Sequence, residues 1–314
     1  GAAGAWLGVT GREWAVAATN AKQHIPESIA HTPSRTVAVE SPFDLGRTAA
    51  PVAWGRGRWP NVHWSEGSLI WCGLEDGAVV WRAVRQVGPA MLAIDGPANP
   101  SGDWAWSTDT LGIDIVAPTF TDDALRDLLA RHAGLRPFAH GSLWEGLAGS
   151  IVGQGVSVAG GATLLSRIAA LVHPGVRLAG RTLWPMPTPV EIAALGGERL
   201  REVGLTRQRA AALADAAGAI RDGVLTISDP LRFREEALAI RGIGPWTVAS
   251  ALLWGVGDAD IHPAGDVALL RAARRFLDDP TLSMRELDAL SERWRPYRSW
   301  AARLLWLELL GPAE

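Results

Sequence analysis

Residues 239–271 read AIRGIGPWTVASALLWGVGDADIHPAGDVALLR, and this stretch decides how the chain is interpreted. The pattern predicts a helix that Gly242 stops, a Gly-Ile-Gly turn, and a second helix with Pro245 at its favoured first position. A loop then leads to Asp266, at the start of an amphipathic segment with helical spacing. The stretch therefore predicts two helices joined by a tight turn, followed by a carboxylate on a loop.

The turn is a candidate phosphate-binding site made of backbone. So short a glycine turn leaves the N–H groups of Gly242, Gly244 and Trp246 pointing outward. Such a cluster at a helix N-terminus binds phosphate without a basic side chain. The alternative is a plain turn between two core helices, because Gly-x-Gly alone is a weak signature.

Asp266 has two interpretations. Its place before VALLRAARRFL predicts an N-cap, whose carboxylate accepts a backbone N–H. A carboxylate held in this way beside the turn is also a candidate catalytic group. Asp258 and Asp260 are expected to be solvated turn residues, and His262 is expected to fix the loop.

Composition excludes several classes of protein. The 314 residues suffice for two or three packed units, and 48% apolar with 20% charged residues is typical of a globular chain. No run of eighteen apolar residues predicts a membrane span, and the first residues lack the pattern of a secretory signal. The net charge of −3 lowers the expectation of nucleic-acid binding without excluding a few well-placed phosphate contacts.

Two residue types are nearly absent. Cys72 is the only cysteine, which excludes internal disulfides and a four-thiolate zinc or iron–sulfur site. Lys22 is the only lysine among 30 basic residues. We expect a cytoplasmic protein without an iron–sulfur cluster.

The apolar spacing changes from strand-like to helical along the chain, which predicts an α+β fold. An antiparallel sheet with one face covered is expected at 36–112, from the segments TVAVE, PVAWGRGRW, SLIWCGL, AVVWRAV and AMLAID. The Pro/Gly/Ser/Asp-rich stretch 95–112 is the expected boundary. An all-helical domain follows at 113–314, with the two-helix motif at 231–257 and the aspartate loop at 258–266. Residues 1–35 are left as an N-terminal segment of uncertain structure.

The stretch GIGPWTVASALLWGVGDADIHPAGDVALL resembles the helix-hairpin-helix of DNA glycosylases, in the branch of bacterial DNA-3-methyladenine glycosylase II. It keeps the Gly-hydrophobic-Gly turn and an Asp twenty residues after Trp246. Three more segments resemble that branch: LWEGLAGSIVGQGVSVAGGATLLSRI, PMPTPVEIAALGGERLREVGLTRQRAAALADAAGAI and SERWRPYRSWAARLLW.

The resemblance implies a monofunctional glycosylase of base excision repair, acting on alkylated purines of the 3-methyladenine and 7-methylguanine type. The enzyme would flip the damaged base out of duplex DNA. Asp266 would stabilise the sugar cation that forms as the N-glycosidic bond breaks. Trp246 and Trp306 would form the base pocket by stacking.

The resemblance also implies DNA contacts. Gln154 takes the family's glutamine position on the DNA-inserting loop, and Gly155 stands where a bulky wedge residue is common. Val156 or Gln154 itself is a candidate replacement for that wedge. Gly242, Gly244 and Arg241 are expected at the phosphates, and further candidate phosphate contacts are Arg207, Arg209 and Arg298.

Metal and lyase chemistry follow from the same comparison. The carbonyls of Leu238, Ile240 and Ile243 align with the family's structural Na⁺ or K⁺ site, and no other cofactor is expected. The family's Schiff-base lysine is replaced by Trp246, and the predicted helical region has no lysine. We therefore expect no lysine-dependent AP-lyase step.

The expected partner is double-stranded DNA with damaged bases, bound by a nucleoid-associated bacterial monomer that contacts no membrane. Two alternatives stay open. The same fold could act on an oxidised or bulky base, or the chain could be a non-enzymatic helix-hairpin-helix DNA-binding protein. Asp266 argues against the second alternative, because phosphate binding alone needs no such carboxylate.

Overall fold

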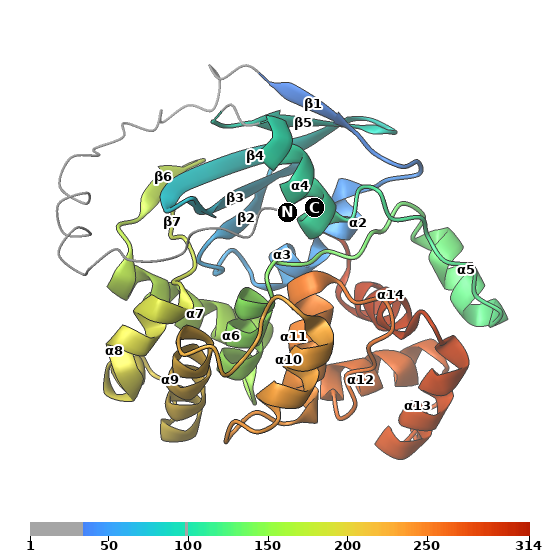
Figure 1. Ribbon diagram of the computed structural model, residues 1–314. Coiled ribbons are helices and arrows are strands. Elements are labelled where there is room, and N and C mark those ends of the chain that lie inside the picture. Colours follow the sequence, from blue (N-terminus) through green and yellow to red (C-terminus); the bar gives the residue numbers. More distant parts are fainter. Residues whose placement is uncertain (1–33, 98–99) are drawn as a thin grey trace, which may run out of the picture.

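The computed structural model describes residues 34–97 and 100–314, in which a β-sheet lies against a layer of helices (Figure 1). The predicted α+β fold, an N-terminal antiparallel sheet followed by helices, is confirmed. Almost all of the N-terminal segment 1–35 lies outside the described residues.

The sheet is antiparallel, with the strand order β1-β5-β4-β3-β2. Two of its two-residue turns, Glu66–Gly67 and Asp76–Gly77, have both residues at positive φ. Positive φ at both positions gives a turn whose twist matches that of the strands. The strands are β1 (Arg35–Ala38), β2 (Val62–Ser65), β3 (Ser68–Glu75), β4 (Ala78–Gly88) and β5 (Met91–Asp95).

Both faces of the sheet are covered, so the expectation of a single covered face is wrong. Leu69 on β3 packs in one apolar cluster with Trp106 of α4 (Pro100–Leu111). Cys72 on the same strand points to the other face and packs with Leu178 and Leu183. Those two residues belong to a small hairpin, β6 (Val176–Leu178) and β7 (Arg181–Leu183), that the helical part of the chain contributes.

Two segments differ from the sequence-based expectation. Residues 51–59 are not a strand: α3 (Ala50–Trp54) begins there and a turn follows. Pro51 lies in the first turn of α3, where its missing N–H costs nothing, whereas a sheet ladder would need that donor. The expected boundary stretch 95–112 contains α4, which packs on the sheet.

The helical layer is centred on α6 (Leu143–Gly153) and α11 (Pro245–Val256), which cross where Gly146 meets Gly255. A Cβ on Gly146 would lie 2.6 Å from the Cα of Gly255, so neither position has room for a side chain. The remaining helices are α2 (Leu45–Thr48), α5 (Asp123–Arg131), α7 (Val158–Val172), α8 (Pro189–Glu202), α9 (Arg207–Arg221), α10 (Pro230–Ala237), α12 (Val267–Phe276), α13 (Met284–Ser291) and α14 (Arg298–Leu310).

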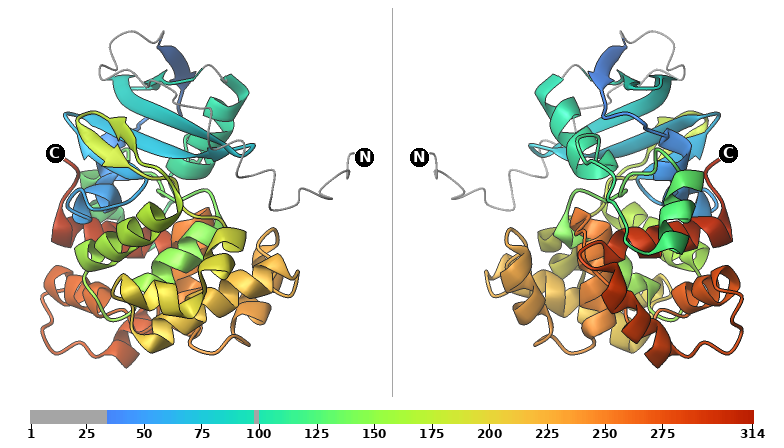
Figure 2. Two further views of the ribbon diagram at one scale, coloured as in Figure 1. Left: turned by 90° about the vertical axis from the view of Figure 1, so that its left-hand side faces the viewer. Right: turned by 90° about the vertical axis from the view of Figure 1, so that its right-hand side faces the viewer.

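The C-terminal end returns to the sheet side of the molecule (Figure 2). The Ala313 N–H donates to the Gly46 carbonyl, and the Trp54 indole N–H donates to the Gly311 carbonyl at 3.0 Å. The two predicted domains thus share contacts at the β6–β7 hairpin and at the C-terminal end, and their division at 112/113 stays a prediction.

Among the described residues, no single helix has the length and apolar content of a membrane span. Only α6 and α7 reach it together, and they are bent by 117° relative to each other. Most side chains of α6 are buried in the helical core, as expected for a central helix of a packed domain.

Candidate active site at the hairpin

A large cleft of about 1530 Å³ lies between α3, α6, the hairpin turn, α11, the loop before α12, and α14. It brings together residues that are far apart in the sequence. The predicted site residues that line it are Gln154, Gly155, Val156, Gly242, Ile243, Gly244, Trp246, Asp266 and Trp306.

Asp266 is the N-cap of α12, as predicted. Its Oδ1 accepts the backbone N–H of Leu269 at 2.7 Å, and its Oδ2 accepts the indole N–H of Trp246 at 3.3 Å. The carboxylate is partly exposed to the cleft. Two donors from two different helices therefore fix both oxygens of the one carboxylate that lines this cleft.

The aromatic wall of the cleft contains Trp254, which the sequence analysis missed. Trp306 is 5% exposed and stacks on Trp254, with ring centroids 5.4 Å apart and planes at 25°. Trp254 follows Trp246 by eight residues on α11, about two helical turns, so the two rings share a side of the helix. Helical spacing from Trp246 could have identified Trp254.

His140 is a second cleft residue that no sequence pattern indicated. Its ring lies edge-to-face against Trp59 at 6.1 Å and Phe138 at 5.8 Å, measured between centroids. Burial, assisted by the positive charge of Arg303, lowers the pKa of His140 to about 4. The imidazole is therefore neutral at physiological pH.

Arg303 lies behind this wall. Its guanidinium carbon is 4.6 Å from the centroid of the Trp254 ring, and an Nη donates to the Leu253 carbonyl at 2.8 Å. The residue is 3% exposed. Burial lowers the pKa of Arg303 to about 9, so the guanidinium stays protonated at neutral pH.

The hairpin turn presents its donors as predicted. Gly242 has a φ of +91°, which an L side chain rarely adopts. Within the described chain, the backbone N–H groups of Gly242, Gly244 and Trp246 donate no hydrogen bond. They remain available to a ligand at the N-terminus of α11.

Gln154 is attached to that turn and does not project outward. Its Nε2 donates to the Gly242 carbonyl at 3.0 Å and to the Thr247 hydroxyl at 2.9 Å. This pairing removes Gln154 as a replacement wedge. The residue links the end of α6 to the hairpin.

The backbone at Gly155 explains why no bulky wedge stands there. Its φ is +68°, in the left-handed region, although a Cβ would meet no atom within 4 Å. An L residue is disfavoured by conformation and not by lack of space. Val156, 38% exposed at the rim of the cleft, is the remaining candidate for the wedge.

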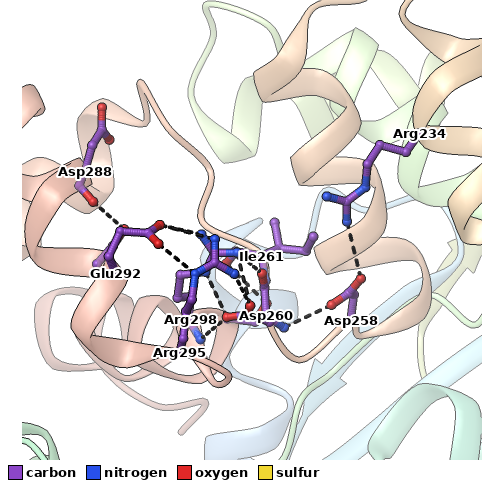
Figure 3. A network of polar contacts seen from close by, with 10 residues as sticks. Arg234, Asp258, Asp260, Ile261, Asp288, Glu292, Arg295 and Arg298 are labelled. Atoms are coloured by element: carbon purple, nitrogen blue, oxygen red, sulfur yellow. Dashed lines mark hydrogen bonds and ion pairs between the residues drawn. The ribbon is translucent and has the colours of Figure 1, made fainter.

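The loop before Asp266 is anchored by ion pairs (Figure 3). Asp260 accepts from Arg298 Nε at 2.8 Å and from Arg295 Nη1 at 2.6 Å. Burial acts to raise the pKa of Asp260, but the hydrogen bonds and charges of these arginines outweigh it and hold that pKa below its usual value. Asp260 is therefore not the solvated turn residue expected, and Arg298 is not free for a phosphate contact.

Other contacts complete this anchoring. His262 Nε2 lies 2.8 Å from the Asp288 carboxylate, in keeping with its expected role in fixing the loop. Arg209 is also unavailable to phosphate, because it is buried and donates to the Val152 carbonyl at 2.8 Å. Arg241, at the turn itself, is exposed and remains the candidate basic contact.

Comparisons with known proteins agree with this geometry. No protein-family model matches the chain. A Bacillus subtilis protein provisionally named a DNA-3-methyladenine glycosylase is 31% identical over 199 residues, which cover 61% of this chain and 67% of the relative. DNA-3-methyladenine glycosylase 2 of Escherichia coli is 31% identical over 193 residues, 60% of this chain and 66% of the relative.

The fold has a solved counterpart as well. The 3-methyladenine DNA glycosylase of Archaeoglobus fulgidus superposes with a TM-score of 0.75 over 87% of this chain and 97% of its own, at 20% identity. Almost the whole of that protein is thus matched in fold, the sheet as well as the helices.

Proposed function

This chain belongs to the DNA-3-methyladenine glycosylase family of the helix-hairpin-helix superfamily, and from that premise we propose that it excises alkylated purines from duplex DNA. One observation carries the proposal: Asp266, the hairpin donors and a tryptophan wall face the same cleft. The proposed substrates are purines of the 3-methyladenine and 7-methylguanine type.

Asp266 supplies the chemistry in this proposal. As the N-glycosidic bond breaks, the sugar gains oxocarbenium character, and a carboxylate near C1′ stabilises that cation and orients the attacking water. The hydrogen bonds from Leu269 and Trp246 fix the carboxylate before the substrate arrives. A group positioned in advance loses little energy to reorganisation during the reaction.

In this proposal the cleft walls hold the flipped base, and the hairpin turn holds the DNA backbone. Extruding a base costs a few kcal/mol, and stacking on aromatic side chains returns about 1–3 kcal/mol per base. Trp246 and Trp306 provide that stacking surface, joined by Trp254. Gly242 and Gly244 donate to the DNA phosphate.

The proposed enzyme releases the base and stops. A lyase step that proceeds through a Schiff base needs a lysine amine, and the family's lysine position holds Trp246. Lys22, the only lysine, lies outside the described residues. Strand cleavage should therefore require added alkali or heat.

A structural cation fits the hairpin. The carbonyls of Leu238, Ile240 and Ile243 lie where α10 ends and the turn begins, on the negative end of the helix dipole. Carbonyl oxygens are the donors that hard cations prefer. These residues would hold Na⁺ or K⁺ beside the DNA phosphate, without a part in bond breaking.

The test uses duplexes that carry 3-methyladenine, 7-methylguanine, hypoxanthine or 8-oxoguanine, followed by alkali. Release of alkylated bases by the wild type, and its loss in Asp266→Asn, is the expected result. Activity on none of the four, or full activity in Asp266→Asn, refutes the proposal. Release of 8-oxoguanine alone supports the alternative of an oxidised substrate.

A further inference from the structure

We propose that the cleft also accepts alkylated purines whose N-linked substituent is the size of an aromatic ring. Bare helix backbone at Gly149 and Gly153, with the Ser250 hydroxyl beside it, makes the room for that ring. The inference rests on the glycosylase function proposed above and names a class of substrate within it. It comes from three residues that line the cleft and that the proposed chemistry does not use.

The two glycines lie on the side of α6 that lines the cleft. A Cβ on Gly149 or Gly153 would meet no atom of a neighbouring element within 4 Å, and neither residue has a positive φ. Glycine is also less favourable than alanine in a helix. Packing and backbone conformation therefore do not require glycine here. The missing side chains leave open space in the cleft.

This open part of α6 lies beside α11 (Figure 1). Towards one end, a Cβ on Gly146 would lie 2.5 Å from the carbonyl oxygen of Ala251. At the other end, Gln154 donates to the Thr247 hydroxyl at 2.9 Å. The two glycines fall between these contacts, next to the part of α11 that contains Ser250.

Ser250 has an unpaired hydroxyl in this part of the cleft. The residue is 5% exposed, lines the cleft, and makes no side-chain hydrogen bond with any described residue. It stands four residues from Trp246 and four from Trp254, so the three side chains share one face of α11. Burying a hydroxyl without a partner is unfavourable, and a ligand that supplies an acceptor recovers that loss. The hydroxyl therefore indicates an occupant with a polar atom.

Together these residues define the chemistry of the substituent. A flat ring packs well against helix backbone that carries no side chain, and Trp246 adds an aromatic surface beside it. Ser250 can donate a hydrogen bond to an acceptor on such a ring. A methyl group has no acceptor and fills little of this space. The occupant that uses both features is an aromatic ring with a hydrogen-bond acceptor, linked to the purine through a methylene group.

The test compares duplexes alkylated at guanine N7 with a methyl, a benzyl or a pyridylmethyl group, of which the last two are alike in size. Released bases are identified by mass spectrometry, and release without enzyme is subtracted. We expect the wild type to release both ring-bearing bases with a kcat/KM within about tenfold of that for 7-methylguanine.

Gly149→Leu fills the proposed space. It should lower the ratio of kcat/KM for the benzyl base over the methyl base about 10- to 100-fold, because an overpacked site excludes the larger group. Gly218→Leu is the matched control, since Gly218 is a helical glycine on α9, outside the cleft, whose Cβ would meet only the Arg221 side chain at 3.9 Å. It should keep the wild-type ratio. Thermal unfolding checks each variant, and Gly153→Leu replaces Gly149→Leu if that variant does not fold.

Ser250→Ala isolates the hydroxyl. It should lower release of the pyridylmethyl base about fivefold more than release of the benzyl base, as expected for one lost hydrogen bond. The two bases have the same size, so a difference between them reports the ring acceptor and not the shape of the cleft.

Release of 7-methylguanine without either ring-bearing base by the wild type overturns the inference alone. A benzyl-to-methyl ratio that the leucine variants leave unchanged does so too. An equal effect of Ser250→Ala on the two ring-bearing bases overturns the role of its hydroxyl. Release of none of the three bases refutes the proposed function together with the inference.

Discussion

Replacing Trp246 with phenylalanine should slow base release without weakening DNA binding. The change keeps an aromatic ring in the cleft and removes the indole N–H that reaches Asp266 Oδ2 at 3.3 Å. A hydrogen bond to a charged group contributes about 1.5–3 kcal/mol, and one longer than the optimum of about 2.9 Å contributes less. A loss of about 1 kcal/mol corresponds to about a fivefold fall in kcat.

The assay is single-turnover base release from a lesion-containing duplex, quantified after alkali, with KM measured in parallel. Trp306→Phe is the matched control, since it trims a stacking ring that makes no hydrogen bond to Asp266. That control should raise KM and change the rate constant less.

The reasoning is refuted if Trp246→Phe leaves the single-turnover rate unchanged.

Three further changes test the surrounding framework. Gln154→Ala removes both hydrogen bonds to the hairpin and should lower the free energy of unfolding, measured in urea, by about 1–2 kcal/mol. It should also weaken DNA binding. Unchanged stability and affinity would show that Gln154 does not link α6 to the hairpin. Gly155→Leu should cost about 1–2 kcal/mol, from its φ of +68°, without improving DNA affinity, and a stabilised variant would contradict the strain argument. Arg298→Met should destabilise the fold by about 1–3 kcal/mol at neutral pH. Because the pKa of Asp260 is lowered in the folded protein, its ion pairs contribute fully above the unfolded value of about 3.9 and are lost as pH falls through the folded pKa. The difference between Arg298→Met and wild type should therefore narrow below about pH 4; a constant difference would exclude Asp260 as the group responsible.

Local patterns predicted the parts of the site that lie close together in sequence. The turn chemistry of Gly242 and the N-cap of Asp266 depend on their immediate neighbours, and the structure has both. The strand prediction for residues 51–59 was wrong because it gave more weight to the alternating apolar residues than to Pro51. A sheet ladder needs the backbone N–H that proline lacks.

Other residues around the cleft were beyond such patterns. His140 and Arg303 come from segments far apart in the chain, and only packing brings Arg303 behind the cleft wall that His140 lines. The pairing of Asp260 with Arg298 was missed for the same reason, since 38 residues separate them. Charge partners at long range leave no spacing signature in one sequence.

The contacts between the sheet and the helical part bear on how the chain folds during synthesis. One face of the sheet is closed by Leu178 and Leu183, which the ribosome adds long after the strands themselves. The hydrogen bond of the Trp54 indole forms later still, because its acceptor, the Gly311 carbonyl, is 257 residues downstream. The first third of the chain therefore emerges with an incomplete core, and its apolar surface stays open to chaperones until the final helix has left the exit tunnel.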